Sequence, residues 1–279
     1  MDLYGRSWRI TVDTLQMEHI DCSFQVKKTL KPEPNTCDLK LYNLTASHRR
    51  QIEQNPAVLE LKKVPVIVEA GYGNTRSQIF KGELRGASSV TNGPDIVTEL
   101  STGDGEKAIA TARLNVPFGP GTSVQAVIEK IVSTIGVLKG NVVQATAILA
   151  AKGQVTFCTK GVVLKGNAAD QMTDLCKSAG LEWSIQDGAI QVLSLGQPLA
   201  GQALVLDSNT GLVGSPAVDS KGVLSATCLM VPGLRPGAQV QINGKHVRGL
   251  FRIAVCEYEG DTKGNDWYVK FQAEKPKSP

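Results

Sequence analysis

The stretch that decides the fold is FQVKKTLKPEPNTCDLKLYNL, residues 24–44. Apolar and polar residues alternate on both sides of its centre, with the apolar set at Ile20, Cys22, Phe24 and Val26 and then at Cys37, Leu39 and Leu41. A period of two is typical of a half-buried antiparallel hairpin. Pro32 and Pro34 cannot donate a hydrogen bond to a strand ladder, so residues 28–36 are predicted to form a projecting loop. The sequence therefore predicts a ribbon with a charged, proline-containing tip.

Length and composition limit the possible classes of protein. With 279 residues, 42% of them hydrophobic, the chain can bury real cores in two or three modules. Thirty Lys and Arg against 26 Asp and Glu give a formal charge of +4 without a long basic run, so we expect no specific nucleic-acid binding. The N-terminal residues lack a signal-peptide core, and no stretch approaches the roughly 18 apolar residues of a membrane span. We therefore expect a soluble chain made in the cytoplasm, without membrane insertion.

The first part of the chain has the pattern of a β module, assigned to residues 1–116. Strand-like segments from about Arg9 to Leu114 are separated by turn signals at residues 71–74, 91–94 and 103–105. One helix interrupts them in LTASHRRQIEQNP, where Thr45 or Ser47 can cap the first turn and Asn55-Pro56 ends the helix.

A change of period marks a small α+β insert, assigned to residues 117–196. A helix is predicted after Thr122 or Ser123 and ending at Gly136, because its apolar residues recur at three and four: Val124, Val127, Ile128, Ile131, Val132 and Ile135. A second helix ends at Gly180, with one face formed by Ala168, Met172, Leu175 and Cys176. Residues 181–185 and 189–193 should then pair across Asp187-Gly188, a favoured hairpin dipeptide.

Strand patterns return in residues 197–279, which are assigned to a second β module. Pro232, Gly233, Pro236 and Gly237 separate its segments, residues 261–265 form a hairpin tip, and residues 275–279 look like a free tail. The predicted fold class is therefore mainly β with a small α+β insert, in which two antiparallel β-barrel-like modules flank a helix-containing module.

The sequence contains no arrangement of residues that indicates catalysis, a metal or a cofactor. It has no phosphate-binding loop and no G-x-S-x-G elbow, and its three histidines (His19, His48, His246) lie in separate contexts. Glu257, Glu259 and Asp261 alternate along one strand, which places them on a solvated face. The six cysteines have no C-x-x-C spacing and are predicted to be buried, reduced thiols. We therefore predict no catalytic, cofactor-binding or metal-binding residues.

Several segments together resemble the tail and baseplate hub proteins of bacteriophages, related to the late-control protein D family and to the hubs of contractile injection machines. The ribbon with its short helix resembles the opening of that family, and VEAGYGNTRSQIFKGEL resembles its next strand pair. TGDGEKAIATARLNVPFGPGTSVQAVIEKIV and LCKSAGLEWSIQDGAIQVL are similar to the helical insert. TGLVGSPAVDSKGVLSATCLMVPGLRPGAQVQI and VCEYEGDTKGNDWYVKFQA resemble the returning barrel. The order of these pieces carries the resemblance, which covers nearly the whole chain.

The resemblance implies a structural virion protein rather than an enzyme. It would be a homotrimer in the tail or baseplate, assembled in the host cytoplasm, whose two barrels per chain match a hexameric tail tube on one side and a three-fold spike on the other. The implied partners are the tail tube protein, the spike and other baseplate proteins, with the tape-measure protein as a further candidate. The chain is shorter than many hubs, which argues against an attached spike or lysozyme-like activity.

The predicted assembly interface comprises the ribbon loop and the start of the short helix, with Lys28, Leu30, Lys31, Pro32, Pro34, Arg49 and Arg50 as candidates. One hypothesis is that the ribbon extends the sheet of a neighbouring subunit or tube ring. The alternative for the basic residues is ordinary solvated charge. Two other functions stay open at this point: a tail-associated enzyme that cuts the cell wall, and a receptor- or carbohydrate-binding protein of the tail tip.

Overall fold

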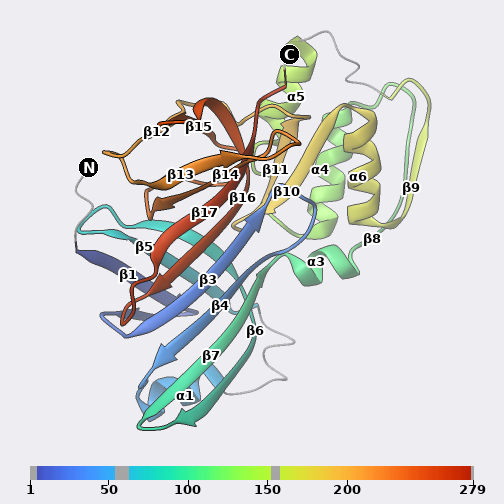
Figure 1. The fold of residues 1–279 in the computed structure, drawn as a ribbon. Coiled ribbons are helices and arrows are strands. Elements are labelled where there is room, and N and C mark those ends of the chain that lie inside the picture. The colour runs from blue at the N-terminus through green and yellow to red at the C-terminus, as the bar shows by residue number, and fades with distance from the viewer. Residues whose placement is uncertain (1–4, 54–62, 152–157, 278–279) are drawn as a thin grey trace.

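One 13-stranded sheet carries both β parts of the chain (Figure 1). The computed structural model describes residues 5–53, 63–151 and 158–277. The first part contributes β1 (Arg6–Val12), β2 (Leu15–Glu18), β3 (Cys22–Thr29), β4 (Asn35–Tyr42), β5 (Pro65–Tyr72), β6 (Ser77–Asn92) and β7 (Asp95–Asp104). The last part contributes β12 (Leu204–Leu206), β13 (Leu212–Val218), β14 (Leu224–Leu229), β15 (Gln239–Asn243), β16 (Arg248–Asp261) and β17 (Trp267–Glu274). The predicted mainly β fold is confirmed.

The two parts repeat the same five-strand unit. The first unit has the order β3-β4-β7-β6-β5, and the second has the corresponding order β13-β14-β17-β16-β15. All strand pairs within both units are antiparallel. The fourth strand of each unit, β6 or β16, is long and has a bulge at the same place, between Leu84 and Gly86 in β6 and between Ile253 and Val255 in β16. The second unit joins the first where β16 pairs with β3.

The predicted ribbon is present as β3 and β4, but its tip was placed wrongly. The strands continue through Lys28 and Thr29 and resume at Asn35, so the loop is only residues 30–34. Both outer edges of the ribbon are already paired within the chain, β3 with β16 and β4 with β7. The hypothesis that this ribbon extends a neighbour's sheet is therefore wrong, because it has no free edge to offer.

One hydrophobic core serves both units. It joins Phe24 and Phe80 of the first unit to Phe251 and Trp267 of the second. Trp267 makes edge-to-face contacts with Trp8 and Phe24, at ring-centroid distances of 6.0 and 5.5 Å. The sheet and its core therefore cross the boundary between the two predicted β modules without a break.

The insert has a separate core and stands beside one end of the sheet (Figure 1). Its elements are α3 (Glu106–Thr111), β8 (Arg113–Phe118), α4 (Val124–Ile135), α5 (Val142–Ala151), β9 (Val162–Asn167), α6 (Ala168–Ser178), β10 (Leu181–Gln186) and β11 (Ala189–Ser194). Helices α4 and α6 and the β10–β11 hairpin are confirmed. Ser123 caps α4 by accepting a hydrogen bond from the Ala126 amide, and Gly136 ends it with a φ of 78°. Helices α3 and α5 and the β8–β9 ribbon were not predicted.

The short helix after the ribbon is also confirmed as α1 (Ala46–Glu53). The hydroxyl of Thr45 accepts a hydrogen bond from the His48 amide, as its predicted capping role requires. The predicted end at Asn55-Pro56 lies outside the described residues. In Figure 1, α1 lies at the end of the ribbon opposite to the loop of residues 30–34.

Candidate assembly surface

The outer side of eight neighbouring strands forms a polar surface, which we call the polar face. It crosses the molecule in the order β6-β7-β4-β3-β16-β17-β14-β13. Since side chains alternate across a strand, residues at every second position share this face while those between them enter the core. The register aligns these side chains from strand to strand, as in Ser88, Glu99, Lys40, Ser23 and Asp261.

Cross-strand ion pairs connect neighbouring strands on the polar face. Lys40 lies 3.0 Å from Glu99, Lys27 lies 3.3 Å from Glu257, and Lys270 lies 2.9 Å from Glu259. The hydrogen bond to Glu99 raises the pKa of Lys40. Glu257, Glu259 and Asp261 were predicted to lie on a solvated strand face, and two of them make these pairs. Charged groups that remain near water thus connect neighbouring strands of the face, whose register is set by the backbone ladders.

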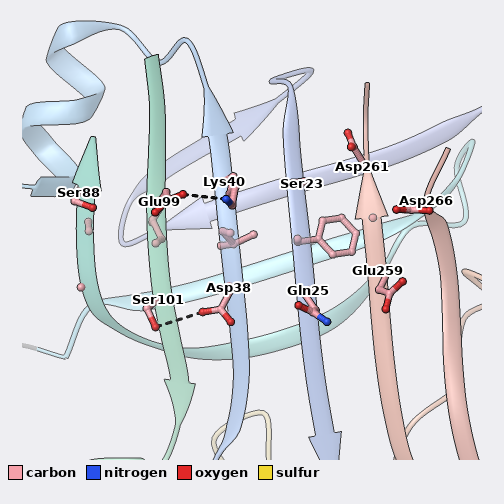
Figure 2. Close-up of a pocket in the computed structure, with 16 residues that line it drawn as sticks. Ser23, Gln25, Asp38, Lys40, Ser88, Glu99, Ser101, Glu259, Asp261 and Asp266 are labelled. Atoms are coloured by element: carbon pink, nitrogen blue, oxygen red, sulfur yellow. Dashed lines mark hydrogen bonds and ion pairs between the residues drawn. The ribbon is translucent and has the colours of Figure 1, made fainter. Parts of the chain in front are cut away.

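A groove of about 810 Å³ runs across β6, β7, β4, β3 and β16 on the polar face. Figure 2 shows the labelled side chains lining it, with Lys40 turned to Glu99 and Ser101 to Asp38. Five acidic residues line it together with Lys40, namely Asp38, Glu99, Glu259, Asp261 and Asp266, and Lys270 pairs with Glu259 from beside the groove. Hydrogen bonding to Asp266 raises the pKa of the neighbouring Tyr268 to about 12. The acidic residues outnumber the lysines, so the groove has a net negative charge.

A second polar cluster joins the insert to the sheet, and we call it the tip contact. It surrounds the turn of the β10–β11 hairpin. The ammonium of Lys28 lies 2.7 Å from Asp187 Oδ2, and the other oxygen of Asp187 accepts from the Lys81 amide at 3.0 Å. Asp104 Oδ1 accepts from the Gly188 amide at 3.0 Å. The charged and polar groups of β3, β6 and β7 therefore all converge on one turn of the insert.

The charged side chains of Lys28 and Asp104 in the tip contact are buried. The side chain of Lys28 is only 3% exposed. Desolvation, with a further contribution from the charge of Asp187, raises the pKa of Asp104 to about 6. The Oδ2 atom of Asp104 is buried and has no hydrogen-bond partner among the described residues.

Two further hydrogen bonds fix the ends of the ribbon strands to the hairpin. The side-chain amide of Asn35 donates to the Ile185 carbonyl at 2.7 Å, and the side-chain amide of Gln186 donates to the Thr29 carbonyl at 2.6 Å. The base of the ribbon loop is therefore held by the insert of the same chain.

The described part of the chain shows no group of three or more His, Cys, Asp or Glu side chains that could hold a metal. All six cysteines are unpaired thiols; five are buried, as predicted, whereas Cys158 is half-buried. Among the described residues, no helix has the length and apolar character needed to cross a bilayer.

Comparison with known proteins identifies the family. The model of the baseplate hub gp41 family matches residues 8–273. The chain belongs to this family. It is thus a structural component of a phage tail or baseplate, as the resemblance in the sequence suggested. A search of curated proteins gave no match.

Solved structures of tail proteins share the fold of this baseplate hub family member at low sequence identity. The 43 kDa tail protein of prophage MuSo2 from Shewanella oneidensis is 10% identical, with a TM-score of 0.63 over 97% of this chain and 98% of that one. A tail protein from Neisseria meningitidis is 12% identical, with a TM-score of 0.65 over 98% and 97%. The E. coli c3393 protein, a type VI secretion component, is 12% identical, with a TM-score of 0.59 over 96% and 77%.

The structure separates the predicted interface residues of this hub family member into three groups. Lys28 and Leu30 are buried. Pro34 and Arg49 are half-buried, and Lys31, Pro32 and Arg50 are exposed. The loop and α1 lie at opposite ends of the ribbon, so these residues do not form one surface (Figure 1). Their role in assembly remains a prediction, and the burial of Lys28 and Leu30 argues against a direct contact of these two with a partner.

The two ends of the polar face, β6 and β13, lie in segments that the sequence predicted as strands, but the prediction did not identify them as the ends of one face. Strand β6, SQIFKGELRGASSVTN, has 16 residues, twice the length of the neighbouring β5. A strand this much longer than its neighbour must leave part of one edge uncovered. That excess length was the signal available in the sequence.

Proposed function

We propose that three copies of this chain form the hub ring that joins the tail tube to the tail-tip spike. The observation that carries the proposal is the repeated five-strand unit. Three chains contribute six such units, so the ring offers six similar positions to a hexameric tube while keeping the three-fold symmetry of a spike. The tube protein, the spike and other baseplate proteins are the proposed partners, and the hub acts by shape rather than by catalysis.

The polar face supplies the wall of the channel in this proposal. A sheet side rich in charged and hydroxyl side chains must face water, whereas the opposite side is buried in the shared core. Because the groove on this face carries five acids and one lysine, its field repels nucleic-acid phosphates. A wall of this kind allows DNA to pass without binding it.

The insert and the exposed part of the ribbon loop lie away from the acidic groove. The three modules, assigned to residues 1–116, 117–196 and 197–279, are proposed to divide the work, with the two β modules forming the ring and the insert contacting other baseplate proteins. Helix α3 and strand β8 are counted with the insert, because they pack into its core. In this arrangement Lys31, Pro32 and Arg50 are candidate contacts with those partners.

Native mass spectrometry of the full chain, supported by negative-stain images, tests the proposal. We expect a trimer whose images show six similar peripheral lobes around a central opening. A chain that stays monomeric at high concentration and in the presence of tube protein would overturn the proposed ring.

A further inference from the structure

Two strand edges at opposite ends of the polar face have no partner among the described residues. Residues 77–83 of β6 pair with β5. Within residues 5–53, 63–151 and 158–277, residues 86–92 of β6 pair only with β7, and β13 at the far end pairs only with β14. Open edges present unpaired amides and carbonyls, and proteins usually cover or block them.

The junction between the two units of one chain shows how such an edge can be paired. In the second unit, β16 pairs with β15 before its bulge and with β3 after it. β6 is its counterpart in the first unit, with a bulge at the corresponding place, and β3 corresponds to β13 by the repeated strand order. The open half of β6 thus lacks the strand that β3 provides to β16.

We propose that the open half of β6 in one subunit pairs antiparallel with β13 of the next subunit. This inference rests on the proposed trimer and specifies its interface. The β16–β3 junction predicts the register of this contact between subunits, because Glu259 is paired with Gln25 there. When the two units are aligned by their strand pairings, Val90 of β6 occupies the position of Glu259 in β16. Ala217 of β13 likewise occupies the position of Gln25 in β3. Val90 therefore lies opposite Ala217 of the next subunit.

The surface of both edges favours this pairing. Val90 is 50% exposed on β6, and Val213 and Val218 are 45% and 44% exposed on β13. Branched apolar side chains on an uncovered edge are a liability in a monomer, whereas they pack well across a strand pair. Both edges therefore gain apolar burial as well as backbone hydrogen bonds when they meet.

The strand directions are also compatible with a closed ring. The eight strands of the polar face alternate in direction from β13 to β6, since every neighbouring pair is antiparallel. With an even number of strands, β6 and β13 run in opposite directions. A copy related by rotation about an axis along the channel therefore presents its β13 antiparallel to β6, and the contact is heterologous and closes into a ring.

A bulge shortens the new ladder at one end of β13. The register with β14 shifts between Val213 and Ala217, where Gly214 has a φ of 69° and Pro216 has no amide hydrogen. The regular pairing is therefore expected around Ala217 and Val218 rather than along the whole strand.

Cysteine cross-linking of the full chain tests the register. Directly opposed residues in an antiparallel pair have Cα atoms about 4.5–5.5 Å apart, which suits a disulfide. The chain carrying both Val90→Cys and Ala217→Cys should form covalent trimers under mild oxidation, and a reductant should reverse them. The matched control carries Ser88→Cys and Val213→Cys, which are exposed on the same face but are offset by about four residues in this register. It should stay uncross-linked, as should the unmodified chain and each single variant.

The outcomes separate this inference from the proposed function. Trimers seen by native mass spectrometry without cross-linking of the matched pair, or with equal cross-linking of the offset pair, overturn the strand pairing and leave the ring intact. Absence of trimers in every variant and in the unmodified chain overturns both.

Discussion

The chain joins its parts in two different ways. At the β16–β3 junction, seven residue pairs form a continuous ladder above a shared apolar core. At the tip contact, the insert keeps its own core and meets the sheet through buried charges and side-chain hydrogen bonds. Apolar interfaces with a continuous ladder make one rigid body, whereas polar interfaces between separate cores permit relative motion. We therefore expect the two β modules to move as one body and the insert as a second.

The largest expected effect comes from the core that both units share. Trp267→Ala removes the ring that packs on Trp8 and Phe24, and should lower the free energy of unfolding by about 4 kcal/mol. Urea unfolding followed by circular dichroism checks this value. Leu250→Ala, at a residue 40% exposed on β16, is the control and should change little. A loss confined to the second unit would show that the two units do not unfold together.

Lys28→Met tests the other junction. It leaves Asp187 and Asp104 without their buried cation, so we expect a loss of about 3 kcal/mol in the stability of insert docking. Hydrogen exchange should rise at the β10–β11 turn while the strands of the shared core keep their protection. Equal acceleration across the sheet would contradict the division into two bodies.

The tip contact should also respond to pH. Burial is the main cause that raises the pKa of Asp104 from its ordinary value of 3.8 to about 6, so its ionised form destabilises the folded state. The penalty is complete above pH 6 and disappears as the pH falls toward the unfolded value. We expect unfolding free energy to rise by about 1.5 kcal/mol between pH 8 and pH 5 from this group.

Asp104→Asn is the matched variant for the pH experiment. It keeps an oxygen for the Gly188 amide but cannot titrate, so it should remove that part of the pH dependence. An unchanged slope in urea titrations from pH 8 to pH 5 would assign the effect to other groups. Lys28 and Asp187 remain present in this variant, so their own contributions stay constant.

The smallest effect is expected one residue away from Lys28. Lys27 lies on the opposite side of β3, where its side chain is 57% exposed and pairs with Glu257. Lys27→Met should change the free energy of unfolding by less than about 1 kcal/mol, because exposed ion pairs contribute little. A loss as large as that of Lys28→Met, measured by the same urea titration, would contradict the assignment of the two faces.

This pair of lysines shows how far the sequence could lead. The alternation that places Cys22, Phe24 and Val26 in the core also places Lys28 there, but the nearby prolines suggested that the strand had already ended. Helix α4 was predictable because its apolar stripe and both end signals agree. Helix α5 was not, since residues 142–151 are largely apolar and form no stripe. The tip contact joins residues far apart in the chain, and no local pattern indicates such a contact.

The β16–β3 ladder also sets the order of events during synthesis. Val26 pairs with Tyr258, so the partner of an early strand is made only when the chain is nearly complete. Until then the β3 edge of the first unit is exposed to other chains on the same polysome. Pairings between strands so distant in sequence form slowly, because the loop must close before any contact is gained. We therefore expect the yield of folded protein to depend strongly on expression temperature and on chaperones that shield open strands.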